Sequence, residues 1–211
     1  MTDRLEALAA GLLQRSAARG AGGGRLVLAI AGPPGAGKST LAAELMAVLE
    51  RLEPGAAALV PMDGFHLDNA VLTARGLMAR KGAPETFDFD GYRAALVRVR
   101  AGETVAVPVF DRELDLARAG AAVVGPGHRV VVSEGNYLLL DRAPWDGLAG
   151  LFDVTLFLSV SEFELRARLL RRWRDHGLSE AAALARAEGN DLANARLVLG
   201  SRRPSDYDWS E

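Results

Sequence analysis

The sequence predicts an α/β fold in which a doubly wound parallel sheet forms the middle of three layers, with helices on both faces. Four or five short apolar runs alternate with segments of helical periodicity, the pattern of β-α-β units. A glycine-rich loop, residues 32–40, stands between one such run and one such helical segment. With 211 residues the chain is long enough for one substantial domain and short for two, so we expect a single domain over 1–211.

The glycine-rich loop fits the pattern G-x-x-x-x-G-K-[ST]. Its members are Gly32, Pro33, Pro34, Gly35, Ala36, Gly37, Lys38, Ser39 and Thr40. The apolar run 26–31 before it is typical of a buried parallel strand, and the apolar residues after it recur with helical spacing. Strand, glycine-rich turn and helix in that order predict a phosphate-binding loop for ATP. Lys38 is expected to reach the β- and γ-phosphates, and Ser39 to ligate Mg²⁺.

The first quarter of the chain supplies a helix, a hinge and a second strand. Residues 3–19 form an amphipathic pattern, and the glycine-rich stretch 20–24 follows as a hinge. The apolar run 56–62 predicts a strand that ends at Asp63. Ligands of open parallel sheets lie beyond the carboxyl ends of the strands, so Asp63 is the candidate general base for a substrate hydroxyl.

The middle of the chain predicts a covering element. Residues 67–86 indicate an irregular, partly helical excursion, and a helix is expected across 91–100. Two β-rich runs, 103–109 and 121–124, indicate a long-looped hairpin that acts as a flap over the site.

The second half predicts two more strands and a lid. The buried strand expected over 129–133, with three consecutive valines, ends at Glu134, the candidate Mg²⁺ carboxylate. A strand over 152–160 precedes Ser161 and Glu164, which suit a capping box. The following arginine-rich helix belongs to an expected lid over 165–190. We expect a last strand at 196–199 and a polar tail from residue 204 onward.

Arginines and lysines on mobile segments are candidates for phosphate and acceptor binding. Arg171 and Arg174 share one face of the arginine-rich helix and are expected to close over the triphosphate, Arg171 with a catalytic role. Only two of the 25 basic residues are lysine, Lys38 and Lys81. Lys81 is therefore expected to contact the acceptor, which would carry several hydroxyls, a carboxylate or a phosphate. Further acceptor-pocket candidates are Phe65, His66, Phe110, Tyr137 and Asn190.

Composition narrows the function classes. The formal charge of −2 gives no basic field for nucleic acid or an anionic membrane, and no apolar run approaches the length of a membrane span. The chain has no cysteine, which excludes disulfides and thiolate metal sites. The N-terminal residues lack the features of a signal peptide. We expect a cytoplasmic protein with a small-molecule acceptor as its partner, and a homodimer is left open.

Together these motifs, in this order, resemble the uridine kinase, phosphoribulokinase and bacterial pantothenate kinase superfamily of P-loop kinases. The resemblance rests on residues 32–40, 62–66, 85–88, 108–111, 134–137 and 171–175. Within the superfamily, the chain most resembles a small bacterial branch described as nucleoside-kinase-like or fructose-transport-associated. It implies the P-loop kinase fold and ATP with Mg²⁺ as cofactors.

By that resemblance Asp63 matches the catalytic aspartate and Glu134 the magnesium-associated glutamate. Asp88 matches the residue that binds acceptor hydroxyls, and Phe110 an aromatic of the acceptor pocket. Arg171 and Arg174 match lid arginines. Asp115 stands near the place of a histidine found in uridine kinases, so uridine is not favoured, and a sugar or a pantothenate-like alcohol remains open.

Two other functions compete with a small-molecule kinase. An adenylate-kinase-like nucleotide kinase is one, because 63–65 superficially fits its Asp-Gly-Phe motif. A non-catalytic ATP-sensing subunit of a transport system is the other. A GTP-binding switch is excluded, since the chain has no Asn-Lys dipeptide to read guanine.

Overall fold

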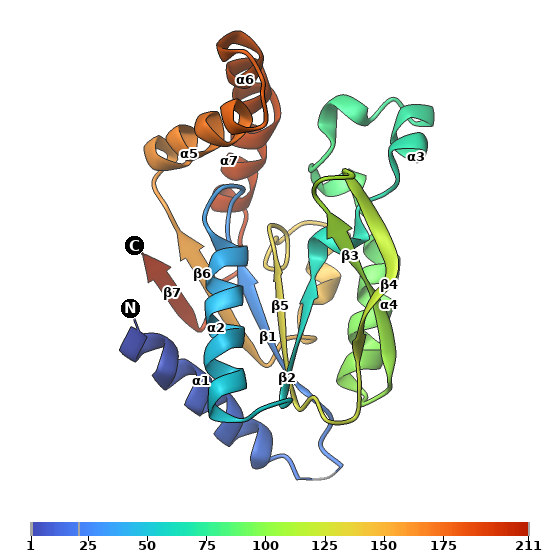
Figure 1. The fold of residues 1–211 in the computed structure, drawn as a ribbon, viewed down its shortest axis with the longest axis vertical. Helices are drawn as coiled ribbons and strands as arrows, with labels where there is room; N and C mark the ends of the chain where they lie inside the picture. The colour runs from blue at the N-terminus through green and yellow to red at the C-terminus, as the bar shows by residue number, and fades with distance from the viewer. Residues whose placement is uncertain (1, 21, 211) are drawn as a thin grey trace.

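Strand β1 (Leu26–Ala31) is the centre of a parallel five-stranded sheet whose order is β2-β5-β1-β6-β7 (Figure 1). The computed structural model describes residues 2–20 and 22–210. The other strands of this sheet are β2 (Ala57–Pro61), β5 (Val130–Gly135), β6 (Val154–Ser159) and β7 (Tyr207–Ser210). The helices are α1 (Thr2–Ala17), α2 (Lys38–Leu52), α3 (Asn69–Ala74), α4 (Phe89–Arg100), α5 (Glu162–Asp175), α6 (Glu180–Arg186) and α7 (Leu192–Gly200).

The sheet separates two apolar layers, as a doubly wound fold requires. Alternate side chains of β1 point to opposite faces, so Leu28 and Ile30 pack with α1 and α2, whereas Val27 and Ala29 pack with α4. Every residue of β1 is buried, which explains its continuous apolar run. The predicted three-layer α/β fold is therefore confirmed.

The carboxyl ends of three neighbouring strands form one edge of the sheet. β1 lies between β5 and β6, and the loop 32–37 leaves its end toward α2. β2 and β5 end side by side, with Pro61 paired to Glu134. This register brings the residues that follow β2 close to the end of β5, at the sheet edge where such folds bind ligands.

The expected flap is a separate antiparallel hairpin, β3 (Val105–Asp111) and β4 (Leu116–Val124). Its turn holds only residues 112–115, so the expectation of a long loop was wrong; residues 116–118 pair with 109–111, and β4 continues through 119 and 120. The hairpin lies against the short helix η1 (Met62–Phe65) that follows β2. A Cβ atom at Gly64 would stand 2.3 Å from the carbonyl oxygen of Pro108, so this close approach requires glycine.

Helices α5, α6 and α7 form a lobe above the sheet edge, opposite α3 and the hairpin tip (Figure 1). The expected cap of α5 is confirmed, because Ser161 Oγ accepts a hydrogen bond from the Glu164 backbone at 3.2 Å. A short π-helical turn, η5 (Ala187–Asp191), joins α6 to α7.

The expected strand at 196–199 was wrong, because these residues continue α7. Leu192, Ala195 and Val198 recur at helical spacing and bury one face, and this packing overrides the β propensity of the local sequence. The expected polar tail also proved to be structured: β7 pairs in parallel with β6 and buries Trp209.

Candidate active site

The glycine-rich loop has the backbone of an anion cradle. Gly35 and Gly37 adopt φ values of 81° and 93°, a region that favours glycine, and Gly37 directly precedes α2. No side chain caps the first turn of α2, so its N–H groups are available to an anion. Lys38 is buried, and its Nζ donates to the carbonyl oxygen of Pro33 at 2.9 Å. The loop therefore combines backbone donors with one ammonium group.

Two carboxylates lie near that lysine. Ser39 Oγ donates to Glu134 Oε1 at 3.2 Å, and Glu134 is itself buried. Burial raises the pKa of Glu134, and the negative charge of Asp63 raises it further. Burial lowers the pKa of Lys38, while the charges of Glu134 and Asp63 act in the opposite direction. The carboxylates of Glu134 and Asp63 therefore repel each other, and a cation bound between oxygen ligands would relieve this repulsion.

This set of oxygen atoms fits Mg²⁺ shared with a nucleotide. Mg²⁺ is usually held by one or two carboxylates together with substrate phosphates and water, rather than by an all-protein cage. Accordingly, among residues 2–20 and 22–210, no group of three or more His, Cys, Asp or Glu side chains could hold a metal ion. Ser39 and Glu134 are the residues that would hold it beside the phosphate loop.

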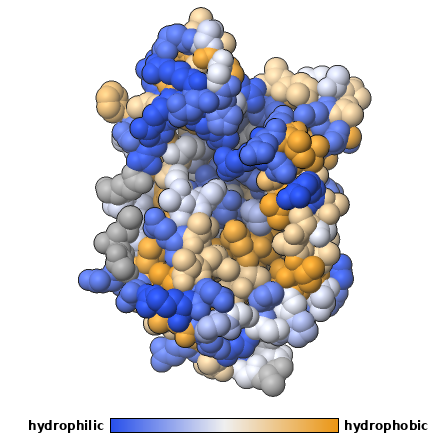
Figure 2. Space-filling model, viewed as in Figure 1, coloured by the Kyte–Doolittle hydropathy of each residue, from blue (hydrophilic) through white to orange (hydrophobic). Residues whose placement is uncertain are grey.

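A cavity of about 550 Å³ lies over the phosphate loop, a volume within the usual range for a ligand pocket. The loop, α5 and the end of β5 contribute its walls. The charged residues that line it are Lys38, Glu44, Asp63, Arg112, Glu134, Glu164, Arg168, Arg171 and Arg172. Figure 2 shows hydrophilic residues covering the lobe of α5 and α6 and bordering the hollow between that lobe and the hairpin side.

A smaller cavity of about 120 Å³ adjoins the first. The two share Pro34, Asp63, Arg112, Asn136 and Arg172 in their walls. Asp63, which is half-buried, lines both cavities and therefore stands at their boundary. Among the residues that the structure describes, Asp63 forms one ion pair, with Arg112, whose nitrogen lies 3.9 Å from Asp63 Oδ2.

Three of the predicted acceptor residues, His66, Lys81 and Phe110, line the smaller cavity. The His66 ring lies 4.0 Å from the Phe87 ring and 4.7 Å from the Phe110 ring, measured between centroids. His66 Nδ1 lies 2.8 Å from the carbonyl oxygen of Asp63, which can only accept, so Nδ1 carries the proton. Burial lowers the pKa of His66, which favours the neutral ring and leaves Nε2 as an acceptor.

The other predicted acceptor residues have partners within the chain and line neither cavity. Asp88 caps α4 by accepting from the Gly91 backbone at 2.9 Å. Tyr137 is buried among aromatic rings and donates to the carbonyl oxygen of Gly82 at 2.6 Å. Phe65 packs edge-on against Tyr92.

Asn190 is likewise buried. It donates to the carbonyl oxygen of Lys81 at 2.9 Å and accepts from Asn194 at 3.2 Å. These contacts join the lobe of α5–α7 to the segment that carries Lys81.

The arginines of α5 divide between the cavity and the outer face. Arg168, Arg171 and Arg172 line the larger cavity, and Arg172 lines the smaller one as well. Arg174 lines neither and instead donates to Glu180 at 2.5 Å. Helical spacing from Arg168 to Arg172, i to i+4, was the signal that would have selected Arg172 from the sequence.

Two further residues of this region were missed. Arg112 stands in the hairpin turn, directly after the aspartate that ends β3, and Asn136 follows the end of β5. Asn136 had a usable signal, since it lies past a strand end like Glu134. Arg112 had none, because only the docking of the hairpin on η1 brings it to Asp63.

Comparison with known proteins found a matching family model and several relatives. The model of the Phosphoribulokinase / Uridine kinase family matches residues 27–190. A crystal structure of a protein from Silicibacter sp. TM1040, described as a "putative fructose transport system kinase", shares 50% sequence identity at a TM-score of 0.89, covering 97% of this chain and 98% of that one.

Two named relatives match the chain at lower identity. "Putative uridine kinase C227.14" of Schizosaccharomyces pombe is 35% identical over 184 residues, which is 82% of this chain and 78% of the relative. A pantothenate kinase of Rhodopseudomonas palustris is 34% identical over 155 residues, which is 70% of this chain and 49% of that enzyme.

In the described part of the chain, no helix is both long enough and apolar enough to span a bilayer.

Proposed function

The chain belongs to the phosphoribulokinase/uridine kinase family, and from that premise we propose that this kinase transfers the γ-phosphate of ATP to a hydroxyl group of a small molecule. The observation that carries the proposal is the position of Asp63 at the boundary of two adjoining cavities. Transfer between two bound molecules requires the reacting oxygen and phosphorus to meet at such a boundary.

In this proposal the larger cavity takes ATP. The backbone N–H groups of residues 32–40 and the Lys38 ammonium bind the phosphates, as P-loop residues do. Ser39 and Glu134 are the residues that would hold Mg²⁺, and a bound Mg²⁺ would neutralise charge on the phosphate oxygens. The contact between Ser39 and Glu134 supports this assignment, because it presents two oxygen atoms on the same side of the loop.

The smaller cavity takes the acceptor. Asp63 accepts the proton of the acceptor hydroxyl as that oxygen attacks, and it holds the hydroxyl in line. His66 and Phe110 form walls beside it. Arg112, whose nitrogen lies 3.9 Å from Asp63 Oδ2, holds the carboxylate in place.

Residues 165–190 act as the lid. Arg171 and Arg172 face the cavities and stabilise charge on the transferred phosphoryl group. Arg174 was expected in the same role, but its ion pair with Glu180 favours Arg172 instead.

The test is an ATP-consumption screen across nucleosides, sugars, sugar phosphates and pantothenate-like alcohols, with the Asp63→Asn variant beside the wild type. The proposal expects consumption that depends on one class of acceptor, and a loss of roughly 10²-fold or more in kcat in the variant, with little change in ATP affinity. ATP binding without turnover on any acceptor would favour an ATP-sensing protein instead.

A further inference from the structure

We propose that the acceptor is a short-chain hydroxy acid, selected by the small size and the positive charge of the cavity beside Asp63. This inference rests on the proposed function and names the class of its substrate. It follows from three features: the volume of the cavity, the way its wall is held, and two arginines that lack close carboxylate partners.

The cavity is too small for a nucleoside. Its volume of about 120 Å³ compares with roughly 150 Å³ for an engineered protein cavity that holds benzene, a molecule of six heavy atoms. An acceptor of about three or four carbons fills such a space. A base and a ribose together exceed this volume and would have to extend into the larger cavity or displace the wall.

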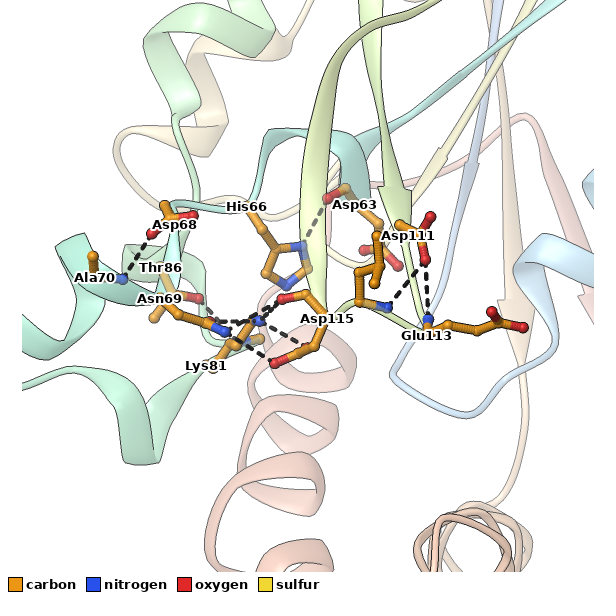
Figure 3. A network of polar contacts seen from close by, with 12 residues as sticks. Asp63, His66, Asp68, Asn69, Ala70, Lys81, Thr86, Asp111, Glu113 and Asp115 are labelled. Carbon is orange, nitrogen blue, oxygen red and sulfur yellow. Dashed lines mark hydrogen bonds and ion pairs between the residues drawn. The ribbon is translucent and has the colours of Figure 1, made fainter.

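A compact network holds that wall (Figure 3). Lys81 Nζ donates to Asn69 Oδ1 at 2.7 Å and to the backbone carbonyl of Asp115 at 2.8 Å, and it pairs with Asp115 Oδ1 at 2.8 Å. Asn69 also donates to Asp115 Oδ2 at 3.2 Å. The three hydrogens of the ammonium group are thereby matched by three oxygen atoms, so Lys81 closes the cavity between α3 and the hairpin turn.

The same segment is held from the lid side. The carbonyl oxygen of Lys81 accepts from Arg186 at 3.0 Å and from Asn190 at 2.9 Å. Lys81 is only 8% exposed, so separating it from Asp115 would leave a buried ammonium without its partner. Widening the cavity therefore costs free energy, and the wall is a size filter.

The charged side chains around the smaller cavity that lack a close partner in the described part of the chain favour an acceptor that carries a negative charge. Lys81 is paired with Asp115, and Asp191 accepts from Trp173 at 2.5 Å. Among the described residues, Arg172 has no ion pair, and the nearest carboxylate oxygen to Arg112 is that of Asp63 at 3.9 Å. Arg112 and Arg172 thus face the smaller cavity with carboxylates only at a distance, Asp63 for Arg112, and Asp191 and Asp63 for Arg172, and a carboxylate on the acceptor would be a closer partner.

The first experiment compares acceptors of matched size. Glycerate and erythronate carry a carboxylate, glycerol and erythritol are their neutral counterparts, and uridine is larger and neutral. With wild-type protein, ATP and Mg²⁺, at least one of the acids should show a kcat/KM at least about tenfold above its neutral counterpart and above uridine.

Two outcomes of this comparison overturn the inference. Preferential turnover of uridine or of a neutral polyol does so and leaves the proposed function standing. If none of the five molecules stimulates ATP consumption and neither acid binds in calorimetry with a non-hydrolysable ATP analogue, the inference also fails; the wider acceptor screen then decides the proposed function separately.

Two sets of variants test selection by charge and selection by size separately. Arg112→Met should raise the KM for the acid at least about tenfold and raise it more than the KM for ATP. Glu113→Gln, an exposed change in the same hairpin turn, is the matched control and should leave both unchanged. A loss confined to kcat in Arg112→Met would show that Arg112 serves only the transferred phosphoryl group, and would overturn its role as the acid's partner.

The size filter is tested by Phe110→Ala and the milder Phe110→Leu. Phe110 lines the cavity and lies 5.1 Å from Lys81 Nζ, measured to the ring centroid. Removing ring volume should raise the kcat/KM for uridine relative to the acid at least about tenfold in the alanine variant. A folded variant with unchanged preference would overturn the size argument.

Discussion

Gly64→Ala tests how the hairpin is held over Asp63. The new Cβ would lie 2.3 Å from the carbonyl oxygen and 2.7 Å from the carbonyl carbon of Pro108, distances at which real Cβ atoms essentially never occur. Both atoms are backbone, so the clash cannot be relieved by a side-chain rotation and the hairpin must move. Overpacking of this kind costs about 1–3 kcal/mol.

For a chain of 211 residues, a loss of about 2 kcal/mol corresponds to a decrease in Tm of roughly 4–8 °C. Because the hairpin carries Phe110 and Arg112 to the acceptor cavity, the KM for the acceptor should also rise at least about threefold, and by more than the KM for ATP. Differential scanning calorimetry and steady-state kinetics measure the two effects.

The control is the same substitution at Gly11, in α1, where an added Cβ meets nothing within 4 Å. Gly11→Ala should stabilise the protein by about 0.5–1 kcal/mol through helix propensity alone. A Gly64→Ala protein with wild-type Tm and wild-type acceptor KM would refute the reasoning, because the hairpin could then not be in contact with η1 as described.

Three further predictions concern the lid, a buried arginine and a histidine. Arg171→Ala and Arg172→Ala should each lower kcat more than they weaken ATP binding, whereas Arg174→Ala should have little effect on either; steady-state kinetics and calorimetry compare them. Arg25→Met should lower the free energy of unfolding by about 3 kcal/mol in urea titrations. The reason is that the guanidinium donates to four buried or half-buried backbone carbonyls at 2.6–2.8 Å. A loss below about 1 kcal/mol would contradict the importance of these hydrogen bonds. The pKa of His66 is lowered in the folded state, so between the folded and unfolded pKa values the unfolded chain binds a proton that the native protein does not. The free energy of unfolding should therefore fall as the pH decreases from about 6.5 toward the folded pKa. His66→Gln should remove that part of the pH dependence, and an unchanged curve of stability against pH in this variant would be evidence against the neutral ring.

The candidate site was only partly predictable, and the reason is visible in individual residues. Asp63 and Glu134 follow apolar runs directly, so their place at the sheet edge could be inferred from the two strands alone. Lys81 was selected because lysine is rare in this chain, and it does line the smaller cavity. Its contact with an acceptor stays a prediction, since its three donors are directed to Asn69 and Asp115 here.

The amino-acid sequence by itself determined the features that depend on neighbouring residues. The phosphate loop, the strand before it and the helix after it are encoded within 26–52, and the start of α5 is marked by Ser161. Each of these rests on backbone conformation, helical or strand periodicity, or a cap, which are set by residues a few positions apart.

Tertiary structure decided the features that depend on distant partners. The β propensity of residues 196–199 gave way to the burial of one face of α7, and β7 formed because β6 offered an edge to pair with. Arg112 reaches Asp63, and Lys81 reaches Asp115, only because the hairpin docks on η1. Contacts between segments far apart in the chain leave no local signal, and in this protein those contacts set the size and charge of the acceptor cavity.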